Sequence, residues 1–461
     1  MGLDNSITKP YVRTEMVPQK APPPGTVGPR KWLWDNVFAS MLNFTTVGNA
    51  ITSILMIVLT FGVIFLAWWV AAVLLKFGWQ DAIFTGTDGS YCRPEDNKGK
   101  VPIGQNIGAC WPFITHRFGQ FMNGFYPEPE RWRIYLTYII GAPLIAGLLI
   151  PSIPRKGLNS ILLFVAYPII ATILLSGGNM EIAGSTYIFW AVVFAAILIT
   201  LFAVEKLTDS KGLFAAGGKV VIAVAIAMFA ILFLLDFDFG LEFVETSRWG
   251  GLMLTLVIGL VGIVVSLPLG IILALGRRSQ MPVVRLASTI FIEVWRGVPL
   301  ITVLFMSSVM LPLFFAEGVS FDKLIRALIV VALFSSAYMA EVVRGGLQAI
   351  PKGQYEGAQA LGLSFWQTTN LITMPQALKL VIPGIVNTFI GLFKDTTLVS
   401  IIGLYDFLGI QEAALQDTAW LAPTNQMTGF LFMAAVYFMF CFSMSRYSLY
   451  TERRLHTGHE R

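Results

Sequence analysis

The sequence predicts an all-α polytopic membrane protein with about ten transmembrane helices. Three observations lead to this fold class: the composition, the length of the apolar runs, and the sign of the charges between them. Of the 461 residues, 56% are hydrophobic and only 13% are charged, and the mean hydropathy is +0.70. Soluble domains carry about 25% charged residues, so this composition excludes an ordinary soluble protein. The net charge of +5 is therefore a topology signal and not a footprint of nucleic-acid binding.

Ten apolar runs are long enough to be spans, because a helix needs about 20 residues to cross a hydrocarbon core of about 30 Å. The candidates are residues 50–75, 134–151, 159–176, 186–204, 217–236, 250–276, 288–313, 326–344, 377–398 and 427–446. Five candidates precede Arg248 and five follow it, and the two halves show no convincing sequence repeat. Internal duplication is therefore not supported.

The sixth candidate span carries a row of small residues. Gly262, Ser266, Gly270 and Ala274 recur every fourth position, so they share one face of a helix. A flat face of this kind lets another helix approach closely. We expect ordinary helix packing at this row and no binding site.

The charges in the loops fit one orientation. With the N-terminal tail inside, the basic residues that also fall inside include Arg155, Lys206, Arg277, Arg344 and Arg446. The outside loops at 236–245 and 406–417 are acidic. Because Lys and Arg collect in short cytoplasmic loops, we expect both termini and residues 345–375 on the cytoplasmic side.

This topology divides the chain into four parts. They are a Pro-rich cytoplasmic tail at 1–49, an extension of about five spans at 50–245 with an outside loop at 77–133, a core at 246–448, and a basic tail at 449–461. The long outside loop has both signs of charge and says little about topology, because long loops translocate largely regardless of charge.

Two of the three cysteines, Cys92 and Cys110, share that outside loop. In an oxidising compartment a disulfide between them is allowed and would close the loop. Two unpaired thiols remain the alternative, because sequence does not give the distance between them. Cys441 lies in an apolar run and is expected to be a buried small hydrophobe. Three cysteines and three histidines leave little for a metal site.

Residues 345–375 form a polar interlude between two very apolar segments. Pro351 suits the first turn of a helix, and Gly362 suits a helix stop. Ser364, with Gln367 three residues later, is typical of a capping box that opens a second helix. We predict two short helices here that form a docking surface where the chain leaves the membrane.

The interlude resembles the cytoplasmic EAA loop of ABC importer permeases. The matching pattern is Glu356-Gly-Ala358, three residues, Gly362, nine residues, Ile372, one residue, and Met374-Pro375. Gly357 and Met374 replace the usual Ala and Leu of the family, and both changes are mild. Three more stretches resemble the polar amino-acid branch of that family: Trp295–Leu300, Ala340–Gly346 and Gly391–Leu398.

The resemblance covers about Ser247 to Arg446, and the ten-span length is similar to the larger, M-type subunit of general L-amino-acid transporters. It implies a type I importer core of five helices in the bacterial inner membrane. The implied partners are a second, related permease, two copies of a cytoplasmic ATPase, a periplasmic amino-acid-binding protein, the lipid bilayer and an L-amino-acid substrate, with no nucleic acid. ATP and Mg would be bound by the ATPase, because this chain has no Gly-x-x-x-x-Gly-Lys-Ser/Thr loop. The chain is thus expected to be no enzyme itself.

Within the loop, Tyr355, Ala358 and Leu361 are spaced three apart and predict one apolar ridge on a short amphipathic helix. Small residues at 357, 358 and 362 would let a partner's groove close on the backbone. The residues expected to couple to the ATPase are Tyr355, Glu356, Gly357, Ala358, Leu361 and Gly362. The alternative is an interfacial connector with no partner.

Charges inside spans are costly unless they are paired, hydrated or at an interface. Six of them are candidates for the substrate pathway or its gates: Glu293, Arg296, Glu341, Arg344, Lys394 and Asp395. A zwitterionic amino acid needs compensating charges of both signs. Glu341 and Arg344 stand three apart and could simply pair, whereas Lys394 and Asp395 are adjacent and point to different faces.

Two rival functions stay open on the sequence alone. A self-sufficient secondary transporter would have two related halves with broken helices and would be driven by an ion gradient. The absence of visible internal symmetry argues weakly against it. A nonconducting subunit that lends only its docking loop to a complex is the other alternative.

Overall fold

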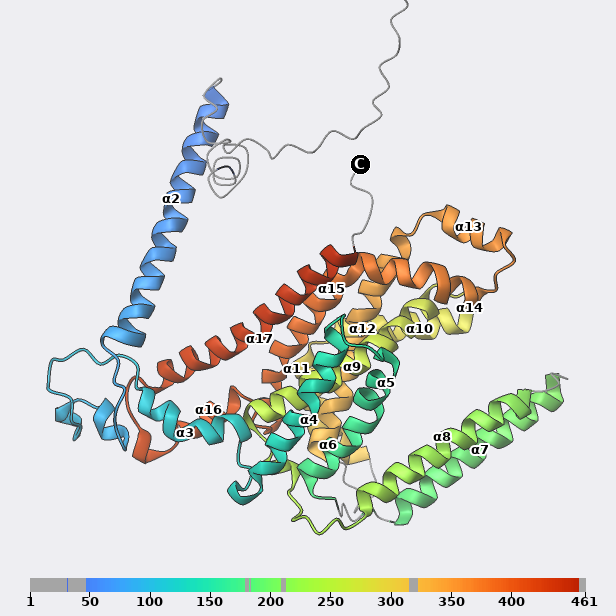
Figure 1. Ribbon diagram of the computed structural model, residues 1–461, viewed down its shortest axis with the longest axis horizontal. Helices are drawn as coiled ribbons and strands as arrows, with labels where there is room; N and C mark the ends of the chain where they lie inside the picture. Colours follow the sequence, from blue (N-terminus) through green and yellow to red (C-terminus); the bar gives the residue numbers. More distant parts are fainter. Residues whose placement is uncertain are drawn as a thin grey trace, which may run out of the picture. The chain divides into compact units, whose positions relative to one another are not determined.

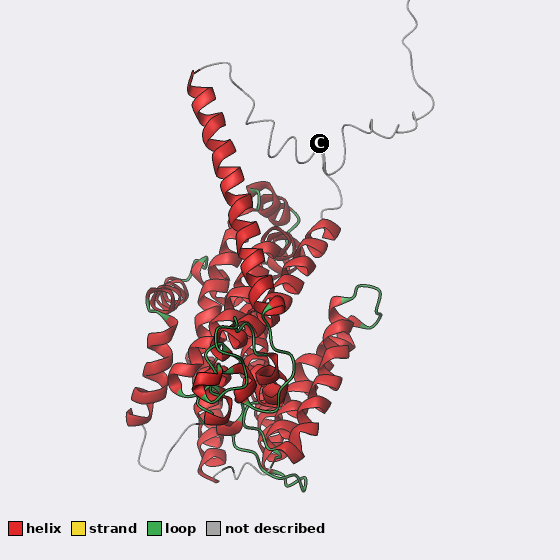
Figure 2. Cartoon of the chain, turned by 90° about the vertical axis from the view of Figure 1, so that its left-hand side faces the viewer, coloured by secondary structure: helices red, strands yellow, loops and turns green. Residues whose placement is uncertain are grey.

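The computed structural model describes residues 31, 47–178, 182, 184–208, 213–314 and 322–455. In this part of the chain the regular elements are helices, and no strand is present (Figure 2). The all-α prediction is therefore confirmed. Most of the predicted Pro-rich tail, namely residues 1–46 apart from Lys31, and the last residues of the predicted basic tail, 456–461, lie outside the described residues.

Nine stretches of the described chain are long and apolar enough to cross a membrane, and a bent helix pair raises the number to ten. Their helices are α2 (Val47–Leu75), α4 (Arg131–Leu149), α5 and α6 (Lys156–Ile161 and Tyr167–Ser176), α7 (Gly184–Thr208), α8 (Leu213–Asp236), α9 (Gly251–Arg277), α12 (Lys323–Ala349), α15 (Met374–Asp395) and α17 (Asn425–Leu455). Except at 288–313, each predicted span falls on one of these stretches.

The predicted span at 288–313 is wrong as a single helix. The chain forms α10 (Pro282–Gly297) and then α11 (Leu300–Phe305), which runs on to Phe314, and the two pieces are bent by 99°. The break falls at Gly297-Val298-Pro299, where Val298 is extended at φ −110° and ψ 134°. Proline disfavours helical backbone in the residue before it, which ends α10 there.

The chain consists of two compact units, Met1–Ala82 and Ile83–Arg461. In the first unit α2 is followed by one π-helical turn, η2 (Lys76–Gln80), and none of the side chains described from Ile54 to Gln80 is buried. A helix that is apolar all round suits the lipid of a membrane. In the second unit α7 and α8 lie side by side (Figure 1).

The centre of the second unit is the packing of α12 on α9 and α15 (Figure 1). The predicted small-residue face of α9 is confirmed, because Gly262, Ser266, Gly270 and Ala274 are all buried. A Cβ added at Gly270 would lie 2.7 Å from the Met339 Cβ of α12. Only a residue without a side chain allows this approach of the two helices.

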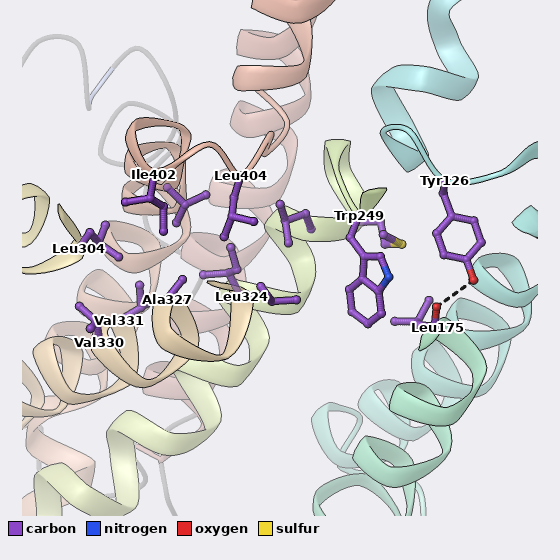
Figure 3. Packing of buried hydrophobic residues seen from close by; sticks show 14 of the residues in the cluster. Tyr126, Leu175, Trp249, Leu304, Leu324, Ala327, Val330, Val331, Ile402 and Leu404 are labelled. Carbon is purple, nitrogen blue, oxygen red and sulfur yellow. Dashed lines mark hydrogen bonds between the residues drawn. The ribbon is translucent and has the colours of Figure 1, made fainter. Parts of the chain in front are cut away.

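An apolar cluster around Trp249 joins the end of the extension to the core. Trp249 lies between Tyr126 and Leu175 on one side and Leu324 and Leu404 on the other (Figure 3). The Tyr126 hydroxyl donates to the Leu175 carbonyl oxygen at 2.9 Å, and burial raises the pKa of Tyr126 to about 12. The phenol therefore stays a neutral donor at physiological pH.

The predicted outside loop contains an element that the charges did not indicate, α3 (Trp111–Asn123). We call residues 83–126, which include α3, the cap. A disulfide between Cys92 and Cys110 joins Cα atoms 5.8 Å apart within the cap. Two isolated backbone bridges, Ile83 with Cys110 and Pro94 with Val101, fold the rest of the cap around that bond.

Candidate functional site

The polar interlude forms one short helix, α13 (Lys352–Ala360), and a helical turn, α14 (Phe365–Thr368), which continues through the π-helical turn η10 (Thr369–Thr373) into α15. The predicted second short helix is therefore the first turn of a longer helix. Pro351 precedes the first, and Gly362 follows its end with φ +70°, a conformation that glycine adopts without strain. Ser364 and Gln367 make the predicted capping box, in which each side chain accepts from the other residue's backbone N–H. In the chain α13 follows the end of α12, and α14 leads into α15 (Figure 1).

The predicted apolar ridge on α13 faces mostly inward. Ala358 is 2% exposed, and Tyr355 packs against the buried cluster of α12 and α15. The Tyr355 hydroxyl donates to the Leu347 carbonyl oxygen at 3.2 Å, and an Arg278 Nη1 donates to that hydroxyl at 3.3 Å. Tyr355 and Ala358 thus pack α13 against its own bundle, as the apolar face of an amphipathic helix does. Their coupling to an ATPase stays a prediction.

Leu361, the third residue of the predicted ridge, is exposed. With three further large side chains it makes up what we call the exposed ridge: Leu361, Phe365, Trp366 and Leu371, with 78%, 61%, 64% and 70% of their surface exposed. The Phe365 and Trp366 rings lie edge to face, with centroids 5.2 Å apart. Glu356, Gly357 and Gly362 are exposed beside it. An aromatic pair directly after a capping serine was the sequence signal that could have indicated this ridge.

Five charged side chains from three helices meet in what we call the charged cluster: Arg277, Glu293, Arg296, Glu341 and Arg344. Glu341 of α12 is the shared acceptor. Its nearest ion-pair contacts are 2.6 Å to Arg277 of α9, 2.6 Å to Arg344 and 3.7 Å to Arg296 of α10. Glu293 pairs with Arg277 at 2.8 Å. The cluster therefore ties α9, α10 and α12 together.

The pairing of Glu341 with Arg344 that the sequence allowed is present. Arg344 donates through both Nε and Nη2 to the Glu341 carboxylate, which is the geometry that makes an arginine–carboxylate pair strong. Arg296 also lies over the Tyr338 ring at 5.6 Å. Sequence reasoning treated Arg277 only as a topology marker, because its partners are 16 and more residues away in the chain.

Lys394 and Asp395 are not part of this cluster. They end α15, whose 22 residues span about 33 Å from the interlude at Met374. Both are exposed, and among the described residues neither makes an ion pair. Two opposite charges near one end of a membrane-crossing helix require water or a partner chain around them.

The described residues contain no group of three or more His, Cys, Asp and Glu side chains that suits a metal ion. The candidate site thus has two parts at one end of the bundle, the exposed ridge and the charged cluster. Near both parts, Arg278, the neighbour of Arg277, contacts Tyr355 and so links α13 to the end of α9. A movement of α13 would therefore reach α9 and α12 directly.

Comparison with known proteins identifies a family and two long relatives. Residues 266–457 match the family of binding-protein-dependent transport system inner membrane components. The chain is 45% identical over 427 residues, 93% of each chain, to the inner membrane amino-acid ABC transporter permease protein YhdY of Escherichia coli. It is 42% identical over 458 residues, 97% of this chain and 99% of the other, to the glutamate/glutamine/aspartate/asparagine transport system permease protein BztC of Rhodobacter capsulatus.

Among solved structures, an amino acid ABC transporter crystallised with histidines covers 44% of this chain at 30% identity, with a TM-score of 0.40. That alignment spans 92% of the solved chain.

Proposed function

This chain belongs to the family of binding-protein-dependent transport system inner membrane components, and on that premise we infer that it is the permease subunit of an ATP-driven ABC importer of L-amino acids. Its two long relatives, each matched over at least 93% of its own length, are amino-acid permease subunits by name. A self-sufficient secondary transporter is not favoured.

The observation that carries the proposed mechanism is the exposed ridge, which runs from the end of α13 through α14 into η10. An apolar ridge at the end of a bundle suits a partner protein's groove. We place that partner in the cytoplasm and identify it as the ATPase that binds ATP and Mg. Because Tyr355 and Arg278 tie α13 to α12 and α9, closure of the ATPase would move the membrane helices.

The chain supplies one half of the transport pathway. It has one coupling loop, and importers of this family work around a pathway made by two permeases, so we propose a second, related permease, two ATPase copies and a periplasmic binding protein as partners. The orientation that follows from the loop charges puts both termini in the cytoplasm and the cap outside the inner membrane.

The substrates we propose are polar or general L-amino acids. Lys394 and Asp395 offer both signs of charge to a zwitterion at exposed positions of α15, so they are the candidates for the pathway. Glu341 pairs with Arg277, Arg296 and Arg344, and Glu293 pairs with Arg277. Because these charges already have partners, their proposed role is to transmit movement at a gate rather than to bind substrate.

Co-purification tests this architecture. An affinity tag on this chain, extracted in mild detergent from its own cells, should bring down a second permease and a protein with a phosphate-binding Gly-x-x-x-x-Gly-Lys-Ser/Thr loop. Truncating the exposed ridge to alanine should release the ATPase and leave the permease pair. A chain that purifies as a monomer or as a homodimer without any ATPase would contradict the proposal.

A further inference from the structure

The cap is the part of the extension with the most specific contacts to the core. It belongs to the same compact unit as the core helices, although four candidate spans separate it from α9, the first core helix, in the sequence. At the end of the bundle away from α13, it covers the segment between α15 and α17, residues 403–424, which we call the covered loop. This loop includes α16 (Gly409–Ala414) and the short η12 (Thr418–Trp420).

Apolar side chains fill the boundary between the cap and the covered loop. Phe113 and Phe121 of α3 are completely buried, and they share one cluster with Phe407 and Trp420 of the covered loop. The rings are in direct contact: Phe113 lies edge to face with Phe121 at 5.7 Å, and its centroid is 6.2 Å from that of Trp420. Lifting the cap would expose this whole aromatic cluster to water.

Polar contacts fix the register of the two parts. The Cys110 N–H, next to the disulfide, donates to the Thr428 Oγ1 at the start of α17, at 2.9 Å and out of water. Arg117 of α3 forms an ion pair with Asp417 of the covered loop. A buried hydrogen bond that is broken leaves two unsatisfied groups, so it resists sliding as well as lifting.

The backbones also approach so closely that side chains would not fit. A Cβ at Gly251, the first residue of α9, would lie 2.2 Å from the Phe121 carbonyl oxygen, and Gly251 has φ +64°. A Cβ at Gly89 of the cap would lie 2.7 Å from the Ala419 carbonyl oxygen of η12. The backbone of the cap thus packs directly against the backbone of α9 and of η12.

The covered loop is in turn bound to two core helices. Its Phe407 N–H donates to the Thr255 Oγ1 of α9 at 2.9 Å, and the Tyr437 hydroxyl of α17 donates to the Asp406 carboxylate at 3.2 Å. The same carboxylate accepts the N–H of Gly409 at 2.9 Å. Burial raises the pKa of Asp406 to about 6, which still leaves the carboxylate mostly ionised at neutral pH.

We propose that the cap is a permanent brace: it holds the covered loop and the adjoining ends of α9 and α17 together as one body throughout the transport cycle. The alternative for a structure at this end of a transporter is a lid that lifts in each cycle. The contacts favour the brace, because the boundary combines a buried apolar cluster, a buried hydrogen bond and close packing of backbone on backbone, all of which lifting would break. The extension would thereby stabilise one end of the bundle while the other end moves with α13.

Cross-linking across the boundary separates a brace from a lid. In the reconstituted complex, the double variant Arg117→Cys/Asp417→Cys is treated with a short, reducible reagent that links two thiols. Each single variant, treated in the same way, is the control. A brace predicts that uptake does not change when the bridge forms. Uptake that is lost on bridging and regained on reduction, with both single variants unaffected, would overturn the proposal.

Hydrogen exchange tests the same idea without transport. In a Cys92→Ser/Cys110→Ser variant, amides of α16 and of the cap should lose protection together, because a brace couples them. Faster exchange that is confined to the cap would refute the coupling. Thiol counts on the unfolded wild-type chain, made with and without reductant, first confirm that the bond is present.

The uptake experiment rests on the proposed function, whereas the exchange experiment does not. If the complex shows no uptake at all, but the cap and α16 still lose protection together, the result counts against the importer function and not against the brace.

Discussion

Replacing Glu341 by glutamine is expected to lower the uptake rate per inserted protein by roughly tenfold, the change that about 1.4 kcal/mol produces. Glu341 is the only carboxylate within the charged cluster that contacts Arg277, Arg296 and Arg344 together. A neutral amide cannot compensate three guanidinium groups, and hydrogen bonds to charged groups contribute about 1.5–3 kcal/mol each. Helices α9, α10 and α12 would lose their common anchor next to α13.

Glu293→Gln is the matched control for this experiment. Glu293 has the same chemistry, but its side chain is 54% exposed and pairs with Arg277 alone. Exposed ion pairs contribute about 0–1 kcal/mol, so this variant should keep most of its uptake. The two variants are compared by their initial rates of ATP-driven uptake, measured at equal amounts of inserted protein. Their thermal unfolding in detergent is measured alongside. Equal losses in both variants would show that Glu341 has no special position in the cluster.

Trp366→Ala is expected to weaken binding of the ATPase by roughly 30-fold, because truncating a central aromatic anchor costs about 2 kcal/mol. The ring is 64% exposed, so its removal should leave the folded chain intact. Uptake should fall in parallel, and ATP hydrolysis should no longer respond to the loaded binding protein. Measuring the Kd between the purified permease pair and the ATPase gives the loss of affinity directly.

Ile103→Ala is the control for Trp366→Ala, because Ile103 is also a large apolar residue, is 72% exposed, and lies in the cap instead of the coupling loop. It should leave ATPase binding unchanged. If Trp366→Ala binds the ATPase as tightly as Ile103→Ala, the exposed ridge is not the docking surface. The Glu356→Lys variant extends the comparison to an exposed polar position of the neighbouring helix α13.

Local features of the fold could be predicted because they depend on neighbours in the sequence. The small-residue face from Gly262 to Ala274 follows from a four-residue spacing, and the capping box follows from Ser364 and Gln367. The bend at Gly297-Val298-Pro299 does not follow from hydropathy, because the apolar run at 288–313 is long enough for one span, and only Pro299 marks the break.

Features that depend on distant residues could not be predicted in this way. Periodicity placed Tyr355 and Ala358 on one face of α13, but it does not say whether that face meets a partner or the chain's own helices. Arg277 looked like a topology marker until Glu293 and Glu341 were found beside it. The contact of Phe113 with Trp420 joins residues about 300 positions apart, which no local pattern can indicate.

The most direct test of the account is the energy source for uptake. Proteoliposomes that contain this chain with its second permease, the ATPase inside and a loaded binding protein outside should accumulate labelled L-amino acid when ATP is enclosed. They should accumulate none when an ion gradient replaces ATP. Uptake by this chain alone, in vesicles free of ATP and driven by an ion gradient, would contradict the account.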